Sequence, residues 1–409
     1  MVDESMRILV LSFYYAPDLA AGSFRTTALV KALTQPAITE RQVDVITTLP
    51  NRYKSFSSEA PEAESCPGLS VRRIPLPSHS SDVVGQARAF WVFARRVLQE
   101  IRGRRYDVVF GTSSRLMTAV LAALCARRTK GRLYLDIRDL FSDTVGDVFP
   151  ASCAWLLKAV FSRLEAWTMR SADKVNLVSR GFARYFEERY PGIPLSFISN
   201  GIDPEFLEPR AENSGRTHSV PDDAGPIRVV YAGNIGEGQG LHNVLPGLAR
   251  RLSNKVGFRV IGDGGRRAQL EAALSASGCT NVELILPVPR VQLLAEYDQA
   301  DVLFLHLNDF DAFKKVLPSK LFEYAASGKP IWAGVSGYAA EFIRQEVCNA
   351  AVFPPCDVDA GVESLASLAL VDSPRPDFIQ RYGRARLMQQ LAADVLAVAA
   401  RRDRAGGKA

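Results

Sequence analysis

The segment KKVLPSKLFEYAASGKP, residues 314–330, gathers positive charge where a helix is expected to begin. Pro318 suits the first turn of a helix and Gly328 suits a left-handed end, so the spacing predicts a helix over 318–327. A helix start already attracts anions through its free N–H groups. Lysines added there repel one another unless a multivalent anion binds, and a diphosphate has that chemistry.

Four side chains of this segment form a candidate site. Lys315, Ser319 and Lys320 supply charge and a hydroxyl donor at the helix start. Glu323 lies one turn further on, about 5.4 Å along the axis, where a carboxylate can accept hydrogen bonds from ribose hydroxyls. The pattern therefore predicts a nucleotide diphosphate. The alternative is a solvated helix end with a surface pair between Lys320 and Glu323.

Two glycine-rich segments follow strand-like runs in the same half of the chain, YAGNIGEGQGL at 231–241 and VIGDGG at 260–265. Glycine lets the backbone approach a phosphate closely. Neither segment satisfies the dinucleotide pattern G-x-G-x-x-G or the P-loop ending. Each is weak evidence by itself, but three phosphate-compatible loops in one domain favour nucleotide binding.

Strand-like runs alternate with helix-like runs through the chain, which predicts an α/β fold with parallel sheets. The alternation stops at 209–226, a polar segment rich in Pro and Gly that we interpret as a linker. We expect one Rossmann-like domain over 1–210 and another over 225–379. Two such domains facing each other would place the ligand in the cleft between them.

The composition is that of a globular protein, with 409 residues, 47% hydrophobic and 23% charged. Six scattered cysteines without a C-x-x-C pair predict reduced thiols, no disulfide and no structural zinc. The acidic N-terminus and the short apolar run after it do not form a secretion signal. We therefore expect a cytoplasmic protein.

The formal charge of +6 is uneven, because residues 80–132 hold 11 basic and 3 acidic side chains. Residues 86–105 predict a helix with an apolar stripe of Phe90, Trp91, Val97, Leu98 and Ile101. The arginines beside the stripe are Arg88, Arg95, Arg96, Arg102 and Arg105. This pattern suits an anionic membrane surface, and the alternative is an ordinary surface helix. Nucleic acid is not an expected partner, because no motif for it accompanies the arginines.

In order along the chain, these segments resemble the retaining glycosyltransferases of family 4, which have the GT-B fold. SFYYAPDLAAGSFR resembles the N-terminal glycine loop of that family, LDIRDLFSD its D-x-R-D-L-W segment and ISNGID its P-N-G-V-D turn. The two glycine segments and PSKLFEYAASGKPI resemble its donor-binding motifs. The chain departs from many members at Asn234 and Gln239, where they have Arg and Lys, and at Lys315, where they have Glu. We therefore expect Lys315 and Lys320 to replace these two cations at the diphosphate.

The resemblance implies two facing Rossmann-like domains with a cleft, and a C-terminal helix within 380–409 that returns to an N-terminal acceptor domain. The helical pattern near the C-terminus is continuous over DFIQRYGRARLMQQLAADVLAVAA, residues 377–400. It implies retaining transfer of a hexosyl group from a UDP-sugar to a polyprenyl diphosphate-linked saccharide, at the inner face of the cytoplasmic membrane. No metal and no other cofactor is expected, and DFD at 309–311 is interpreted as a solvated loop. The chain is similar to the branch with N-acetyl-L-fucosamine transferases of O-antigen and exopolysaccharide assembly.

The family's site residues carry over to matching positions. Those expected to act in catalysis are Asp136, Arg138, Asp139, Lys320 and Glu323. Those expected to bind the donor are Gly22, Arg25, Asn200, Gly233, Asn234, Gly262, Asp263, Gly264, Val288, Lys315 and Ser319. The family often has His where Arg138 stands. As alternatives, Asp139 caps a helix and pairs with Arg138, and Asn200 is a turn residue.

Two other classes of function compete with this one. A nucleotide-sugar epimerase of similar two-domain shape would consume the donor without an acceptor. A non-catalytic nucleotide-sugar-binding protein would fit the absence of the family's Arg and Lys at Asn234 and Gln239.

Overall fold

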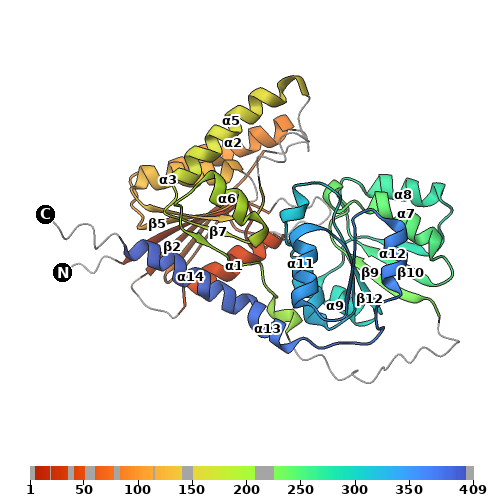
Figure 1. Cartoon of the computed structure of the whole chain (residues 1–409). Helices are drawn as coiled ribbons and strands as arrows, with labels where there is room; N and C mark the ends of the chain where they lie inside the picture. Colours follow the sequence, from red (N-terminus) through yellow and green to blue (C-terminus); the bar gives the residue numbers. More distant parts are fainter. Residues whose placement is uncertain are drawn as a thin grey trace. The chain divides into compact units, whose positions relative to one another are not determined.

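The computed structural model describes residues 5–18, 20–35, 41–50, 60–77, 83–113, 116–140, 151–207 and 225–401, without the side chains of 83–84 and 151–158. The predicted linker at 209–226 lies almost wholly outside the described residues. The chain divides into two compact units, residues 1–200 with 384–409 and residues 201–383. Figure 1 labels the elements of both units.

The first unit contains an eight-stranded sheet in the order β3-β4-β2-β1-β5-β6-β7-β8. The strands are β1 (Met6–Leu11), β2 (Arg41–Thr48), β3 (Ala63–Cys66), β4 (Leu69–Ile74), β5 (Val108–Ser113), β6 (Arg132–Ile137), β7 (Lys174–Leu177) and β8 (Leu195–Ser196). β3 and β4 pair antiparallel, and the other neighbours pair parallel. β5 is buried along its whole length, although only its first three residues are apolar. The pair β3–β4 was not predicted, because all four residues of β3 are exposed and show no apolar pattern.

Helices lie on both faces of this sheet. They are α1 (Ala21–Leu33), α2 (Val83–Glu100), α3 (Leu116–Thr129), α5 (Ala151–Arg170), α6 (Ala183–Arg189) and α14 (Arg384–Ala400). Figure 1 shows α2, α3 and α5 on one side of the sheet and α1 with α14 on the other.

The predicted return of a C-terminal helix to the first unit is confirmed by α14, although the continuous helical pattern is broken at Gly383. The preceding helix, α13 (Pro376–Tyr382), belongs to the second unit. Asp394 of α14 accepts hydrogen bonds from Tyr134 Oη at 2.7 Å, from Ser196 Oγ at 2.5 Å and from Lys174 Nζ. One carboxylate thus joins α14 to β6, β7 and β8.

The second unit contains a six-stranded sheet whose neighbouring strands all pair parallel, in the order β11-β10-β9-β12-β13-β14. The strands are β9 (Ile227–Ala232), β10 (Val256–Ile261), β11 (Val282–Ile285), β12 (Val302–His306), β13 (Ile331–Gly334) and β14 (Ala350–Phe353). Counted along the chain, the order is the doubly wound 3-2-1-4-5-6, which reverses between β9 and β12. Ligands of such sheets bind beyond the carboxyl ends of strands at this reversal.

Successive residues of these strands face two separate cores. Val230 and Leu303 pack with α10 (Lys320–Ser327), α11 (Gly337–Glu346) and α13. Val229 and Phe304 pack with α7 (Leu241–Arg251), α8 (Arg267–Ala276) and α12 (Val358–Leu365). The period of two explains why the central strands β9 and β12 carry apolar residues on both faces. α9 (Arg290–Asp298) packs with the first of these cores through Tyr297.

Candidate functional site

The glycine-rich loop at 233–240 follows β9, at the point where the strand order reverses. The predicted phosphate-binding helix, α10, contacts the end of β9 through Tyr324. The Tyr324 hydroxyl accepts a hydrogen bond from the Ala232 N–H at 3.0 Å. The start of α10 therefore lies near the end of β9. The structure brings together two segments that are about 90 residues apart in the chain and that were both predicted to bind a diphosphate.

Glu323 and Lys320 form an ion pair on the first turn of α10, with 2.8 Å between Lys320 Nζ and Glu323 Oε2. Glu323 is buried, at 7% exposed, whereas the side chain of Lys320 is 29% exposed. Burial opposes the charge on Lys320, but the neighbouring Glu323 outweighs it and raises the pKa of the lysine. The alternative of a surface pair is therefore right about the partner, but the carboxylate of this pair is largely removed from solvent.

The helix itself begins two residues later than predicted, at Lys320 rather than Pro318. Ser319 is its N-cap residue, and its side chain makes no capping hydrogen bond. Lys315 lies just before it in the short 3-10 helix η4 (Phe313–Lys315) and is half-buried. Gly328 ends α10 with φ of 78°, as its position predicted.

The two glycine segments pack against each other. A Cβ at Gly262, where φ is 158°, would collide with the carbonyl oxygen of Gly233, and a Cβ at Gly264 would lie 2.5 Å from that of Ile235. The Ile235 N–H donates to the carbonyl of Asp263 at 2.9 Å. The packing of the loops against each other therefore requires glycine at 262 and 264, whatever else these residues bind.

Asn234 and Gln239, the two residues that stand where many family 4 members have Arg and Lys, bond to each other. Asn234 Nδ2 donates to Gln239 Oε1 at 2.8 Å. A neutral pair thus closes the loop where two cations would otherwise point out of it. Lys320 and Lys315 remain as the cations that were predicted to replace them.

Arg290 is a residue of this region that the sequence analysis missed. It follows Val288, which packs partly buried against the core under α10, by two residues. Arg290 Nη2 donates to Asp203 Oδ2 at 2.5 Å, and its guanidinium lies 4.7 Å from the centre of the Phe206 ring. Burial opposes its charge, but Glu323 and Asp203 raise the pKa of Arg290. An arginine directly after the loop that follows β11 was the available signal.

In the first unit, Arg25 and Asp136, both predicted as site residues, bind to each other. Arg25 Nε and Nη2 donate to the two oxygens of Asp136 at 2.9 Å, and Nη2 and Nη1 also donate to the carbonyls of Ile198 and Ser199. Asp136 also accepts from Asn176 Nδ2 at 2.7 Å. Arg25 is 1% exposed and Asp136 is 0% exposed. Neither side chain has a free surface for donor or acceptor, so both hold the carboxyl end of this sheet together.

The ionisation of Asp136 agrees with this role. Burial opposes its negative charge, but the charge and hydrogen bonds of Arg25 outweigh burial and hold the pKa of Asp136 below its usual value. The carboxylate is therefore a permanent anion within a closed network. It does not have the chemistry of a general base.

Arg138 and Asp139 follow β6 and differ from Asp136 in their exposure. Asp139 is exposed and Arg138 is half-buried. A Cβ at Gly22 would collide with Arg138 Nη1, so glycine at 22 makes room for this guanidinium. Arg138 Nε has no hydrogen-bond partner among the described residues. Asn200 is 5% exposed, and its Oδ1 likewise has no partner in the described part of the chain.

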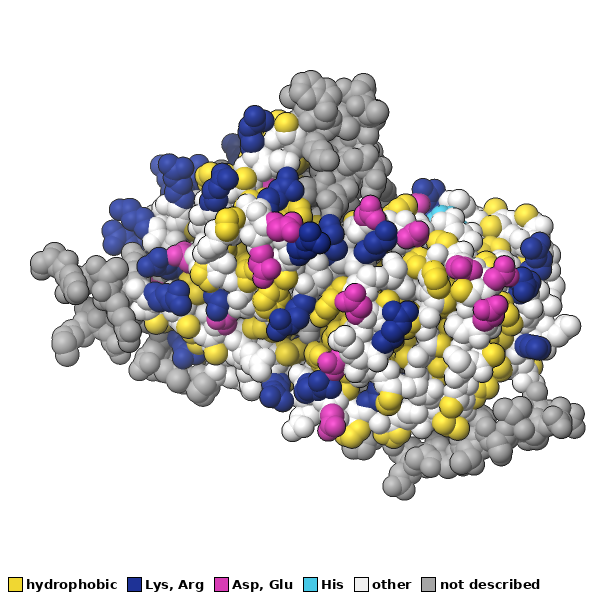
Figure 2. Space-filling view, viewed as in Figure 1, with side chains coloured by type: hydrophobic (Ala, Val, Ile, Leu, Met, Phe, Trp, Pro, Cys, Tyr) yellow, Lys and Arg dark blue, Asp and Glu magenta, His cyan; other side chains and the backbone are white. Residues whose placement is uncertain are grey.

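The predicted apolar stripe of α2 is mostly a core contact. Val97 and Ile101 are buried, Phe90 and Leu98 are partly buried, and Trp91 is 60% exposed. The arginines at 88, 95, 96, 102 and 105 are all exposed, and Arg95 lies 5.5 Å from the centre of the Trp91 ring. Figure 2 shows Lys and Arg side chains spread over the visible face of the first unit.

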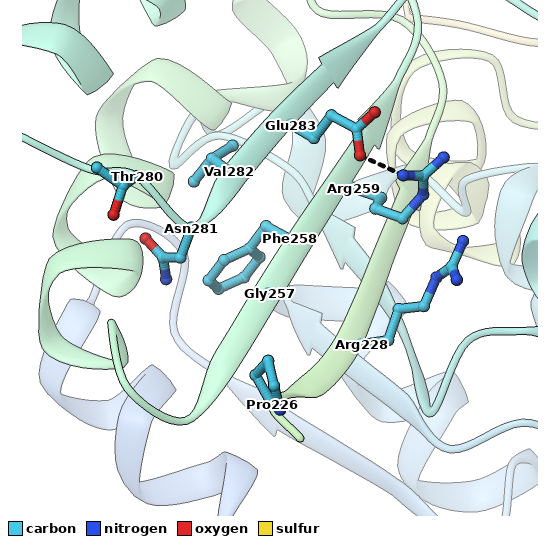
Figure 3. A pocket seen from close by; sticks show the side chains of 9 residues that line it. All are labelled: Pro226, Arg228, Gly257, Phe258, Arg259, Thr280, Asn281, Val282 and Glu283. Atoms are coloured by element: carbon cyan, nitrogen blue, oxygen red, sulfur yellow. Dashed lines mark hydrogen bonds and ion pairs between the residues drawn. The ribbon is translucent and has the colours of Figure 1, made fainter.

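A pocket of about 370 Å³ opens near the amino ends of β9, β10 and β11, away from the loops that follow these strands. Figure 3 shows Arg228, Arg259 and Glu283 around it, with Arg259 paired to Glu283. Both arginines also bind Glu296. These charges are neutralised within the protein, and none of the predicted site residues lines the pocket.

In the part of the chain that the structure describes, no group of three His, Cys, Asp or Glu side chains could hold a metal ion. None of the described helices is both long and apolar enough to cross a membrane.

Sequence comparison matches the two units to two families. The family described as "Glycosyl transferase 4-like domain" matches residues 23–201, and "Glycosyl transferases group 1" matches residues 218–386. WcaI of Escherichia coli K12, named as a colanic acid biosynthesis glycosyl transferase, is 25% identical over 79% of this chain and 82% of its own length. WbjE of Pseudomonas aeruginosa, named as a glycosyltransferase, is 24% identical over 61% of this chain and 62% of its own length.

Structural comparison confirms the predicted fold class. HepE of Anabaena, solved in complex with UDP-glucose, covers 96% of this chain and 99% of its own at a TM-score of 0.64 and 15% identity. Sucrose-phosphate synthase of Thermosynechococcus elongatus covers 98% of both chains at a TM-score of 0.65 and 14% identity. With two Rossmann-like units of GT-B type, each matched by its own family, the chain belongs to the glycosyltransferases of the family 4 and group 1 type.

Proposed function

We propose that this protein moves a sugar, with retention of configuration, from a UDP-sugar to a polyprenyl diphosphate-linked saccharide. The product would be a precursor of O-antigen, capsule or exopolysaccharide. The observation that carries the proposal is the half-buried Lys320–Glu323 pair on the first turn of α10, beside the end of β9. The name of WcaI and the UDP-glucose in HepE support the class of reaction and the nucleotide.

In this proposal each part of the second unit has one task. Glu323 accepts hydrogen bonds from the ribose hydroxyls, and Lys320 with Lys315 neutralises the charge that grows on the departing β-phosphate. Gly233 and Asn234 approach the phosphates, with Ser319 as a hydroxyl donor. The turn at Gly262, Asp263 and Gly264 and the loop at Val288 hold the base. Two lysines replace a metal ion as the source of positive charge.

Arg138 and Asp139 are the residues of the first unit that we propose for the acceptor or the transferred sugar. Of the charged residues predicted for the site in the first unit, only these two are accessible to solvent. Arg25 and Asp136 are buried and bind to each other. Asp139 is exposed and Arg138 is half-buried, so a sugar hydroxyl can reach this pair from solvent. Gly22 supports this role by leaving room for the guanidinium.

We propose that the exposed face of α2 meets the anionic inner surface of the cytoplasmic membrane, where a polyprenyl-linked acceptor resides. Trp91 and the exposed arginines have the chemistry of an interfacial helix. Replacing Arg95, Arg96 and Arg102 with Glu should release the protein from liposomes that contain anionic lipid. Unchanged co-sedimentation would exclude this surface.

The donor sugar is proposed to be N-acetyl-L-fucosamine or a related amino or deoxy sugar. A thermal-shift screen of nucleotide sugars would select the donor. Release of UDP would then be followed with and without a polyprenyl diphosphate-linked saccharide, in buffer with EDTA. Release that requires the acceptor supports a transferase, and donor conversion without acceptor would instead show an epimerase. No turnover with any acceptor, despite UDP binding, would favour a non-catalytic binding protein.

A further inference from the structure

The loop that follows β9 is held in shape from the neighbouring strand β12. These two strands flank the reversal of strand order, where ligands of doubly wound sheets bind. The short 3-10 helix η3 (Glu237–Gln239) lies within this loop. Three successive carbonyls of η3 accept hydrogen bonds from residues at the end of β12 and just after it, so each residue of η3 is attached to this end of the strand.

His306, the last residue of β12, makes one of these attachments. The ring is 1% exposed, and its Nδ1 lies 2.7 Å from the carbonyl oxygen of Gln239. Its Nε2 accepts from the Cys356 N–H at 3.0 Å. Since Nε2 accepts the hydrogen bond of the Cys356 N–H, the ring proton is on Nδ1, and Nδ1–H donates a hydrogen bond to the Gln239 carbonyl. Burial lowers the pKa of His306 to about 4, so the ring stays neutral and keeps this tautomer at ordinary pH.

Asn308 makes the other two attachments. Its side-chain Nδ2 donates to the Glu237 carbonyl at 2.9 Å, and its backbone N–H donates to the Gly238 carbonyl at 2.9 Å. A Cβ at Gly240, where φ is 60°, would lie 2.8 Å from the Asn308 side chain. The glycine at 240 is therefore required by the contact with Asn308.

The surroundings of His306 are otherwise apolar. Its ring packs near Phe304 and Phe353, and a Cβ at Gly334 would collide with it. A leucine or phenylalanine would suit such a pocket without the cost of burying a polar ring. The imidazole differs from those residues in one respect that matters for the loop, which is the N–H that it directs at Gln239.

We propose that His306 is a positioning residue for the nucleotide diphosphate: its Nδ1–H fixes the Gln239 carbonyl, and loop 233–240 keeps the shape that receives the phosphates. This inference rests on the proposed function, because it needs a diphosphate at that loop. It assigns His306 no contact with the ligand. In this inference, the hydrogen bond from His306 to Gln239 shapes the loop for the ligand, and the hydrogen bond from the Cys356 N–H to His306 stabilises the fold.

Two variants separate these two hydrogen bonds. In His306→Asn, the amide nitrogen can take the place of Nδ1 and keep the bond to Gln239. In His306→Gln, the amide reaches the place of Nε2 and keeps the bond to Cys356. Each variant keeps one of the two hydrogen bonds of His306 and loses the other, and both replace the buried ring by an amide. The two variants are therefore matched controls for each other. Calorimetry would give the dissociation constants of UDP and of uridine for both variants and for wild type.

His306→Gln should raise the dissociation constant of UDP at least tenfold and change that of uridine less than twofold. His306→Asn should keep both dissociation constants within threefold of wild type. Equal effects of the two variants, or equal losses of UDP and uridine, would overturn the inference. Wild-type protein that binds neither compound would instead refute the proposed function.

A second measurement uses only the wild-type protein and does not depend on whether the variants fold. In histidine-labelled protein, the Nδ1 resonance of His306 should shift when UDP is added and stay in place when uridine is added. If the protein binds UDP but the Nδ1 resonance of His306 does not shift with either compound, the positioning role is contradicted.

Discussion

Each unit has a cation–carboxylate pair near the carboxyl end of its sheet. Only in the first unit do other residues of the protein complete the hydrogen bonds of the carboxylate. In the first unit, Arg25 and Asp136 are 1% and 0% exposed, and Asp136 accepts from Asn176 as well. In the second unit, the side chains of Lys320 and Glu323 are 29% and 9% exposed. Lys320 is the single hydrogen-bond donor to Glu323 in the described part of the chain.

The comparison separates a scaffold from a site. A buried ion pair with all its hydrogen bonds made within the protein contributes to a defined structure and has nothing left for a ligand. A half-buried pair with free acceptor positions can take ligand hydroxyls in place of water. Similar residue types in similar positions therefore predict opposite mutational signatures.

The largest expected effect is on stability, in the first unit. Asp136→Ala would leave the Arg25 guanidinium buried without its carboxylate, and we expect a loss of about 3–5 kcal/mol in the free energy of unfolding. Urea unfolding followed by circular dichroism measures it. Glu188→Ala, which removes the exposed Arg184–Glu188 pair of the same unit, is the control and should cost nothing measurable. A loss below about 1 kcal/mol for Asp136→Ala would contradict the scaffold role.

The next effect depends on pH and lies in the second unit. The folded pKa of His306 is about 4, below its ordinary value of 6.5, so as the pH falls the unfolded chain takes up the proton first. Stability that is complete above about pH 6.5 should be lost at up to about 1.4 kcal/mol per pH unit, about 3 kcal/mol by pH 4. The difference in unfolding free energy between wild type and His306→Asn measures this. A difference that stays constant from pH 7 to pH 4 would show that His306 is not buried neutral.

Glu323→Ala should show the signature of a site. We expect sugar transfer to fall at least tenfold, about 1.4 kcal/mol in the barrier, because the ribose loses its carboxylate. Initial rates of acceptor-dependent UDP release measure it. Glu341→Ala, at an exposed position on α11, is the matched control and should keep full activity. Wild-type rates in Glu323→Ala would remove this residue from the site.

The smallest expected effect is the stability change in Lys320→Met. The methionine keeps the stem of the side chain and removes its charge, so only the short contact with Glu323 is lost, at about 0.5–1 kcal/mol. Urea unfolding of the second unit measures it. A loss as large as that expected for Asp136→Ala would mean that the Lys320–Glu323 pair is a scaffold after all, and the contrast between the units would fail.

The fold was largely predictable because its signals are local. Apolar runs of strand length, glycines after strands and Gly328 at the end of α10 depend on neighbouring residues, and they predicted parallel sheets, the loops and the helix tip. The exceptions are also local in origin. β3 has no apolar pattern, and Gly383 interrupts a helical pattern that looked continuous.

The use of each polar residue was decided by tertiary structure. Arg25 and Asp136 are 111 residues apart, and His306 and Gln239 are 67 apart, so no local pattern could show that they are partners. The sequence by itself determined which residue types stand at the carboxyl ends of the strands. Only the folded chain decided which of them are buried and neutralised, as Asp136 is, and which keep acceptor positions for a ligand, as Glu323 does, because burial and partners depend on contacts between distant segments.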